Sequence, residues 1–181
     1  MEELWQLYDK QGRAISSKGA TKDDVFNNGL LHSSSHVWIW RARENQREIL
    51  LQQRASDKHI WPNRFDTSAA GHIDLDEKPL DAAIREIAEE IGLTIVGDEL
   101  NLFCVHRTYL KAENGSIENE FQWLYSLELT NKTDFVLQPT EVKSLKWIPL
   151  EQFKAENKSE QYLPHGELYY NTVVSAIESA E

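Results

Sequence analysis

The sequence predicts an α/β protein, an α/β/α sandwich in which a mixed β-sheet lies between helices. An amphipathic helix is predicted near the middle of the chain, strand patterns occur before and after it, and a second amphipathic helix is predicted over residues 166–180. Strands on both sides of a central helix are typical of a sheet covered by helices. With 181 residues, 40% of them hydrophobic, the chain is long enough for one domain, residues 1–181, and short for two.

The N-terminal part is expected to form a hairpin and a loop, followed by a second hairpin. Residues 4–8 alternate apolar and polar before a DKQGR turn signal, which is typical of a hairpin. The polar, glycine-bearing stretch 16–29 is typical of a surface loop, so residues 1–30 are expected to form an N-terminal hairpin and a loop. Residues 37–40 (VWIW) and 48–54 (EILLQQR) have strand composition and are separated by a polar turn. His32 and His36 precede the first of these strands, where such histidines are commonly hydrogen-bonded surface residues.

The central helix is predicted from about Pro79 to Ile91. Proline is tolerated in a first helical turn, and Gly92 follows the last apolar residue, where a left-handed cap is common. The expected buried arc, with ~100° of rotation per residue, consists of Ala83, Ile84, Ile87, Ala88 and Ile91.

The remaining elements are two strands, a short strand and two helices. Strands are predicted over residues 100–110 and 120–129, on either side of an ENGSIEN turn. The second of them alternates Phe121, Trp123, Tyr125, Leu127 and Leu129 on one side. A short strand ending in Trp147 and a helix starting at Pro149 follow. The final helix is expected to cover the sheet with Leu168, Thr172, Val173, Ala176 and Ile177.

Three glutamates form an acidic stripe on the central helix. Glu86, Glu89 and Glu90 have i, i+3, i+4 spacing, which places their carboxylates within one turn on the side opposite the apolar arc. The only nearby base, Arg85, is expected at the edge of this stripe. Either the stripe is a solvated face, or it holds a hard divalent cation such as Mg²⁺, which takes oxygen ligands and is often shared with substrate phosphates.

The wider spacing favours the metal interpretation. The pattern G-x5-E-x7-R-E-U-x-E-E-x-G-U, where U is a bulky aliphatic residue, is filled without a mismatch from Gly71 to Leu93. At about one chance in twenty per letter, seven fixed letters coincide at ~10⁻⁹ per starting position. Residues 71–93 therefore resemble the Nudix box, a loop-helix-loop motif, and the resemblance implies a Nudix-type sandwich.

The resemblance also implies site residues. In Nudix enzymes the glutamates matching Glu86, Glu89 and Glu90 hold Mg²⁺ or Mn²⁺, often with a backbone carbonyl, here near Ala70 or Gly71. The residues matching Glu77 and Arg85 form an internal ion pair. Most members cleave a diphosphate that is linked to another group.

The stretch before the box resembles type I isopentenyl-diphosphate isomerase, a Nudix-fold enzyme, and the hydrolases close to it. The shared features are the LLQQR strand, Lys58, Trp61-Pro62, Ser68 and Gly71-His72. In the isomerase, residues matching His72 and His32 bind a metal ion, and those matching Arg54 and Lys58 hold the diphosphate. The chain departs from the isomerase at Ala70, because the isomerase has its proton-donating cysteine there and alanine has no proton to donate. The single cysteine, Cys104, is expected to be a buried structural thiol.

The leading hypothesis is a Mg²⁺- or Mn²⁺-dependent pyrophosphohydrolase in which water attacks phosphorus. The expected catalytic residues are Glu89, Glu141 and Arg85, where Glu141, ahead of the Trp147 strand, or Glu89 accepts the proton of the water. The alternatives are an isopentenyl-diphosphate isomerase and a catalytically silent module that binds a diphosphate ligand. The aromatic residues leave the substrate open, because they suit a nucleobase and an isoprenoid tail equally well.

Charge and hydropathy exclude some partners. A formal charge of −11 and a pI near 5.0 argue against a nucleic acid polymer as ligand, because phosphate contacts need clustered Lys and Arg. No apolar run approaches the ~18 residues that a membrane span needs, and the start lacks a leader pattern. The expectation is a cytoplasmic protein with a small-molecule diphosphate substrate and no membrane partner, and a homodimer is left open.

Overall fold

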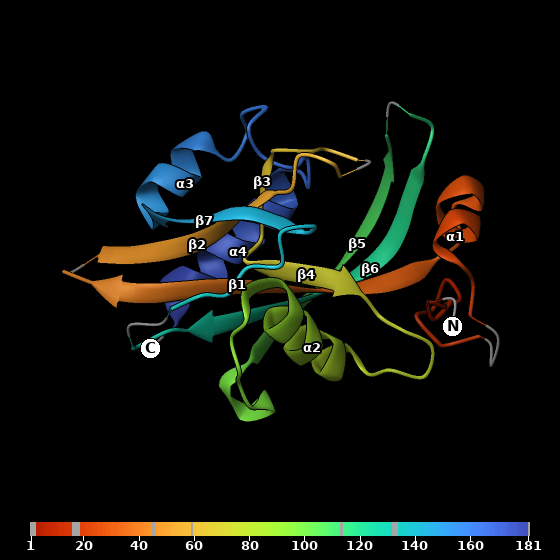
Figure 1. Ribbon diagram of the computed structural model, residues 1–181, viewed down its shortest axis with the longest axis horizontal. Coiled ribbons are helices and arrows are strands. Elements are labelled where there is room, and N and C mark those ends of the chain that lie inside the picture. Colours follow the sequence, from red (N-terminus) through yellow and green to blue (C-terminus); the bar gives the residue numbers. More distant parts are fainter. Residues whose placement is uncertain are drawn as a thin grey trace.

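The structure is a computed structural model that describes residues 3–15, 19–44, 46–58, 60–112, 114–131 and 134–180. Residues 1, 2, 16–18, 45, 59, 113, 132, 133 and 181 lie outside this description, and so do the parts of the predicted N-terminal hairpin and turns that fall on them. The described chain forms a mixed seven-stranded sheet with helices on both faces (Figure 1). The predicted α/β/α sandwich is therefore confirmed.

The sheet is built around two long central strands. Its order is β3-β2-β1-β6-β5, while β4 also pairs with β1 and β7 with β2. β1 pairs with β6 in parallel and with β2 and β4 in antiparallel orientation. The strands are β1 (His32–Arg43), β2 (Gln46–Arg54), β3 (Phe65–Asp66), β4 (Ala69–His72), β5 (Asn101–Lys111), β6 (Ile117–Glu128) and β7 (Val142–Pro149).

Two apolar cores lie on opposite faces of the sheet. Because side chains alternate along a strand, Trp38 and Trp40 of β1 pack with the C-terminal helices, whereas Val37 and Ile39 pack with the central helix. The helices are α1 (Lys22–Asn28), α2 (Pro79–Ile91), the short 3₁₀ helix η1 (Gly97–Glu99), α3 (Leu150–Glu156) and α4 (Glu167–Ser179). None of the helices in the described ranges is long and apolar enough to cross a bilayer.

Helix α2 has the predicted bounds but a different buried face. It ends in Gly92 with φ 69°, in the left-handed conformation that was expected. Ala88, predicted to be buried, is exposed, whereas Ala82 and Glu90 are buried. The buried arc is thus rotated towards Glu90, because the backbone of β4 offers this carboxylate a hydrogen-bond donor that periodicity does not reveal.

The N-terminal region differs from the prediction in two ways. Trp5 and Tyr8 form isolated bridges instead of a continuous strand, and the antiparallel bridge of Tyr8 with Ala14 closes the predicted turn over residues 9–13. The expected loop contains α1, whose first turn is capped by the Thr21 side chain and whose end is the left-handed Gly29.

The burial of three residues differs from what the sequence suggested. His32 and His36 are buried, with 0% and 6% exposure, because β1 begins at His32 and is covered from its first residue. Leu168 is exposed, since α4 packs through Tyr169, Tyr170, Val173, Val174 and Ile177 instead.

Candidate functional site

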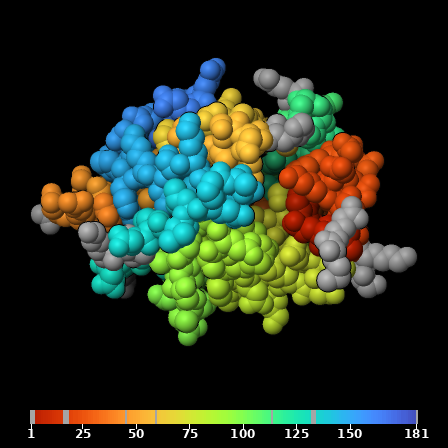
Figure 2. All heavy atoms as spheres, viewed as in Figure 1, coloured from red at the N-terminus to blue at the C-terminus, as the bar shows by residue number. Residues whose placement is uncertain are grey.

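A cavity of about 870 Å³ lies where α2, the N-terminal segment and the middle of the sheet meet. All the predicted site residues except His32 line it. In Figure 2 the orange N-terminal segment lies across a hollow from the gold and cyan segments that carry Lys58 and Glu141. The fold therefore gathers residues from distant parts of the sequence around one opening.

Two glutamates of the acidic stripe lie against the backbone of β4. The Glu90 side chain is 4% exposed, and its Oε2 accepts a hydrogen bond of 3.0 Å from the Ala70 backbone N–H. Glu86 lies so close to Gly71 that a β-carbon at that position would come within 1.8 Å of Glu86 Oε1. A glycine at position 71 is what allows this approach.

Burial changes the protonation of these two carboxyl groups. It raises the pKa of Glu86 to about 7, although Arg85 opposes the shift. Burial also raises the pKa of Glu90 well above its ordinary value, and the charge of Glu86 adds to the effect. Without a cation, these two carboxyl groups therefore bind a proton more readily than an exposed glutamate does.

Arg85 ties the helix to the preceding loop. Its Nε and Nη2 donate to the two carboxylate oxygens of Glu77 at 2.9 Å each, and Nη2 also donates to the His72 carbonyl at 3.0 Å. The expected Glu77–Arg85 ion pair is present. Arg85 Nη1 reaches Glu86 at 2.5 Å and Glu89 at 3.4 Å, so this base contacts the acidic stripe directly. The Glu89 side chain is 56% exposed.

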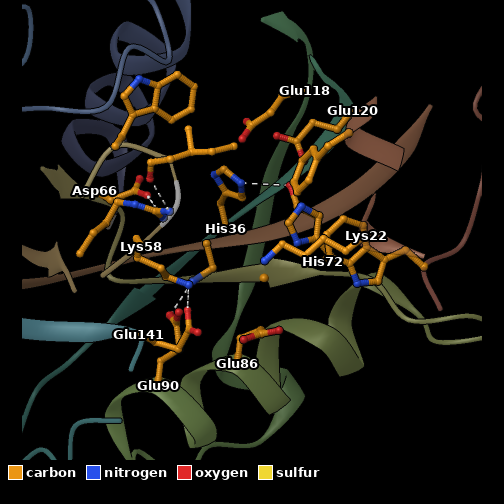
Figure 3. A pocket seen from close by; sticks show the side chains of 18 of the residues that line it. Lys22, His36, Lys58, Asp66, His72, Glu86, Glu90, Glu118, Glu120 and Glu141 are labelled. Atoms are coloured by element: carbon orange, nitrogen blue, oxygen red, sulfur yellow. Dashed lines mark hydrogen bonds and ion pairs between the residues drawn. The ribbon is translucent and has the colours of Figure 1, made fainter. Parts of the chain in front are cut away.

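Three further predicted residues, Arg54, Lys58 and Glu141, line the same cavity. Lys58 forms a close ion pair with Glu141 (Figure 3). Arg54 donates to Asp66 Oδ2 at 3.4 Å and to the Ile60 carbonyl at 3.2 Å. Sequence and structure thus place two bases and a carboxylate beside the acidic stripe.

His32 and His72 meet at a different wall, together with Glu120 of β6. Among the described residues, these three can bring one ligand atom each within 4.8 Å of one another. His32 Nδ1 lies 3.0 Å from the Leu30 carbonyl. Its buried Nε2, for which the described residues supply no hydrogen-bond partner, lies 3.7 Å from Glu120 Oε2. Burial lowers the pKa of both histidines, so their nitrogens carry lone pairs. A cation placed between the lone pair of His32 Nε2 and the Glu120 carboxylate would be bound by both groups.

Sequence reasoning missed several residues of this cavity. Glu118 and Glu120 are two residues apart in β6 and so lie on the same face of the strand, a spacing that is visible in the sequence. Asp66, His36 and His165 also line the cavity. The sequence holds no comparable signal for them, because β1, β3 and the segment before α4 meet only in the folded chain.

The two metal-ligand sets differ in chemistry. The carboxylates on α2 provide the oxygen donors that Mg²⁺ prefers, whereas imidazole nitrogens with a carboxylate suit Mn²⁺ or another transition metal. The residues at both walls therefore fit divalent cations.

Comparison with known proteins identifies similar chains. The family model described as NUDIX domain matches residues 32–168. The chain is 30% identical over 170 residues to "Nudix hydrolase 3" of Arabidopsis thaliana, covering 91% of this chain and 22% of that protein. It thus spans about a fifth of the length of that plant relative.

For one further relative and one solved structure, the similarity to this chain extends over nearly the whole length of the other protein. An isopentenyl-diphosphate Delta-isomerase of Dinoroseobacter shibae is 30% identical over 169 residues, which are 86% of this chain and 90% of the isomerase. The NUDIX domain of Shewanella oneidensis NrtR, crystallised with ADP ribose, superimposes with a TM-score of 0.60 at 16% identity over 94% of each chain. At that identity the likeness concerns the fold.

Proposed function

The chain belongs to the Nudix family and is an enzyme of the Nudix hydrolase type, and from this membership we propose that it is a divalent-metal-dependent pyrophosphohydrolase. The proposed reaction cleaves a diphosphate linkage in a nucleoside diphosphate or another small-molecule diphosphate by attack of water at phosphorus. The observation that carries the proposal is the close placement of the Glu86 and Glu90 carboxylates against the Gly71–Ala70 backbone.

This placement is costly without a ligand. Buried carboxylates lose their hydration, and like charges repel, so the folded protein gains nothing from holding them together unless a cation binds. Glu86, Glu89 and Glu90, with the backbone carbonyl near Gly71, would hold Mg²⁺ or Mn²⁺. When bound, such a cation supplies charge neutralisation for the diphosphate oxygens and lowers the pKa of water.

The other residues of the cavity have roles in binding and proton transfer. Arg54 and Lys58 would hold phosphate oxygens of the substrate. Glu141 would accept the proton of the attacking water, or Glu89 in its place. Arg85, through its bonds to Glu77, Glu86 and the His72 carbonyl, keeps the loop and the carboxylates in position.

His32 and His72 are proposed to hold a second cation, and Glu120 would complete their site. The buried Nε2 of His32, which has no hydrogen-bond partner in the described ranges of the chain, supports this assignment. A bound cation would satisfy an atom that otherwise loses its hydration without any compensation.

The same cluster supports isopentenyl-diphosphate isomerisation as a second candidate, since the isomerase resemblance places a metal at His32 and His72. Protonation of carbon requires an acid within reach of the substrate. Ala70 lies at the cavity in the position where that resemblance places the thiol, and its methyl group is no acid. This difference favours hydrolysis over isomerisation.

The test is a screen of nucleoside diphosphates and triphosphates, sugar and dinucleotide diphosphates, and isoprenoid diphosphates, with Mg²⁺ or Mn²⁺ and with products identified by mass. We expect metal-dependent release of phosphate or a monophosphate. Formation of dimethylallyl diphosphate from isopentenyl diphosphate without phosphate release would replace the proposal by the isomerase. Saturable binding without any turnover would replace it by a silent binding module.

A further inference from the structure

The N-terminal segment, residues 3–8, reaches His72, one of the two histidines proposed to hold the second cation, and the proposed hydrolysis leaves this segment without a role. In Figure 1 the red N-terminal segment lies beyond the end of β4, the strand that ends at His72. Trp5 is 3% exposed and lines the cavity. A distant part of the sequence therefore meets the proposed histidine site.

Backbone hydrogen bonds hold Trp5 in this place from two sides. Its N–H donates to the Ala20 carbonyl at 2.9 Å, and the Ala20 N–H donates back to the Trp5 carbonyl at 3.1 Å. On the other side, the Gln6 N–H donates to the carbonyl of Ile73, the residue after His72, at 3.1 Å. A shift of such pairing by one residue would turn the side chain to the opposite face. The backbone therefore aims the indole of Trp5 at His72.

The indole of Trp5 stacks on the imidazole of His72. The ring centroids lie 3.6 Å apart and the interplanar angle is 11°. Trp5 Nε1 donates to Glu3 Oε1 at 2.6 Å, which restrains rotation of the indole. His32 stacks on the same indole with centroids 5.6 Å apart, and Phe26 of α1 packs edge-to-face against both histidines. Aromatic rings thus enclose the two imidazoles.

The two histidines differ in what orients their rings. A metal-binding histidine usually donates its second ring N–H to a carbonyl or carboxylate, and this bond fixes the ring. His32 has such a partner in the Leu30 carbonyl, 3.0 Å from Nδ1. In the described ranges, His72 accepts a hydrogen bond from Arg85 through its backbone carbonyl, but its ring nitrogens make none. The closest ring contact of His72 is the stack on Trp5, which takes the place of the missing hydrogen bond.

An indole suits this purpose because it does not compete for the cation. The indole nitrogen is a donor only, so Trp5 offers no lone pair to a metal ion. Aromatic pairs attract each other beyond the burial of their area, so the stack favours one orientation of the His72 ring. Stacking covers the face of that ring and leaves its edge free, where a nitrogen lies within 4.8 Å of a ligand atom of His32 and of Glu120.

We propose that Trp5 is a positioning residue of the second metal site, and that its indole holds the His72 imidazole with a nitrogen towards His32 and Glu120. The inference rests on the second cation of the proposed function. It adds a residue from outside the stretch 32–168 that matches the family model, so the ligands of the site depend on a segment that this stretch does not contain.

The experiment measures Co²⁺ affinity by calorimetry in the whole chain at saturating Mg²⁺. Mg²⁺ prefers the carboxylate oxygens of α2, whereas imidazole nitrogens favour a transition metal, so Co²⁺ reports on the histidine site. His72→Gln identifies the heat that belongs to this site. Thermal melts show whether each variant folds.

Three further variants separate the stack from general packing. Trp5→Phe keeps an aromatic ring, and Trp5→Met fills the space with a flexible chain that has none. Leu7 packs on the same apolar cluster as Trp5 but does not line the cavity, so Leu7→Ala is the matched control.

We expect the Co²⁺ affinity to fall ~10–100-fold in Trp5→Met, the loss that is typical when the support of a metal-binding histidine is removed. Trp5→Phe should stay close to the wild type, because a phenyl ring can also stack on His72, and so should Leu7→Ala. Tryptophan fluorescence gives a second readout. Co²⁺ bound at His72 would lie next to the indole and quench its emission, so quenching should be stronger in the wild type than in Trp5→Phe.

Unchanged Co²⁺ affinity in Trp5→Met would overturn the inference, and so would an equal loss in Trp5→Phe or in Leu7→Ala. If Trp5→Met does not fold, Glu3→Ala decides, because it removes the hydrogen bond of the indole at an exposed position. Weaker Co²⁺ binding in Glu3→Ala would then support the inference, and unchanged binding would overturn it.

Failure of the inference and failure of the proposed hydrolysis give different results. A wild type that binds no Co²⁺ would overturn the inference and the second cation, while Mg²⁺-dependent turnover would still support hydrolysis. A Co²⁺ affinity that depends on Trp5, without any Mg²⁺-dependent turnover, would support the inference and contradict the proposed hydrolysis.

Discussion

Gly71→Ala tests the proposed metal site with a single methyl group. A β-carbon at this position would lie 1.8 Å from Glu86 Oε1 and 2.0 Å from Glu86 Cδ, well inside van der Waals contact. The φ of Gly71 is outside the left-handed region, so the backbone of β4 accepts alanine without strain. The Glu86 carboxylate is the flexible end of its side chain, and we expect it to move away from β4 while the strand stays.

The expected loss concerns metal binding, not folding. Disturbing the support of a metal ligand typically weakens binding by ~10–100-fold, or ~1.4–2.7 kcal/mol, and displacing the ligand itself should reach at least that range. Replacing glycine by alanine in a compatible conformation changes stability by less than about 1 kcal/mol. Turnover at subsaturating Mg²⁺ should therefore fall ~10-fold or more, while the melting temperature stays close to that of the wild type.

Calorimetric titration with Mg²⁺ and Mn²⁺, thermal melts and initial rates at several metal concentrations make up the assay. Gly97→Ala is the control, because the nearest atom to its β-carbon is Leu80 Cδ2 at 3.2 Å, away from the carboxylates. Unchanged metal affinity and turnover in Gly71→Ala would refute the assignment of Glu86 and the adjoining β4 backbone to metal binding.

Three further predictions test other groups of the site and the core. Glu90→Gln replaces a buried carboxyl group, whose pKa is already raised, by a neutral amide of the same shape, so folding should be nearly normal while metal affinity falls ~10–100-fold. Undiminished turnover would contradict the metal assignment. Glu141→Gln should lower kcat by ~10²–10⁴-fold with metal affinity intact if Glu141 is the base, and equal losses of kcat and affinity would make it a ligand instead. Burial, with the charge of His165, lowers the pKa of His36 to about 4 from 6.5, so the unfolded chain takes up a proton below pH 6.5 that the folded protein refuses until about pH 4. His36 should therefore lower the free energy of unfolding by ~1.4 kcal/mol for each unit by which the pH falls between these values. In denaturant titrations of His36→Gln the pH dependence should be shallower by this amount, while His32, His72 and His106, whose pKa values are also lowered, keep their own contributions.

The sequence by itself determined the features that depend on local spacing. Helix α2 has the predicted bounds because its first-turn proline, its apolar repeat and Gly92 all act within a few residues of one another. The Nudix resemblance, the Glu77–Arg85 ion pair and the strand hairpin of β1 and β2 were readable for the same reason. A pattern within one element contains the information on that element.

The tertiary structure decided what depends on contacts between distant segments. Glu90 turned from the solvent towards the sheet because the Ala70 N–H, on another element, meets its carboxylate. His32 became buried beside His72 and Glu120 because β1 and β6 run parallel with His32 opposite Glu120. His165 and Asp66, 99 residues apart, share a hydrogen bond that no local pattern encodes. Periodicity gives the face of an element on which a side chain lies, but the partner that the side chain meets depends on how the elements pack.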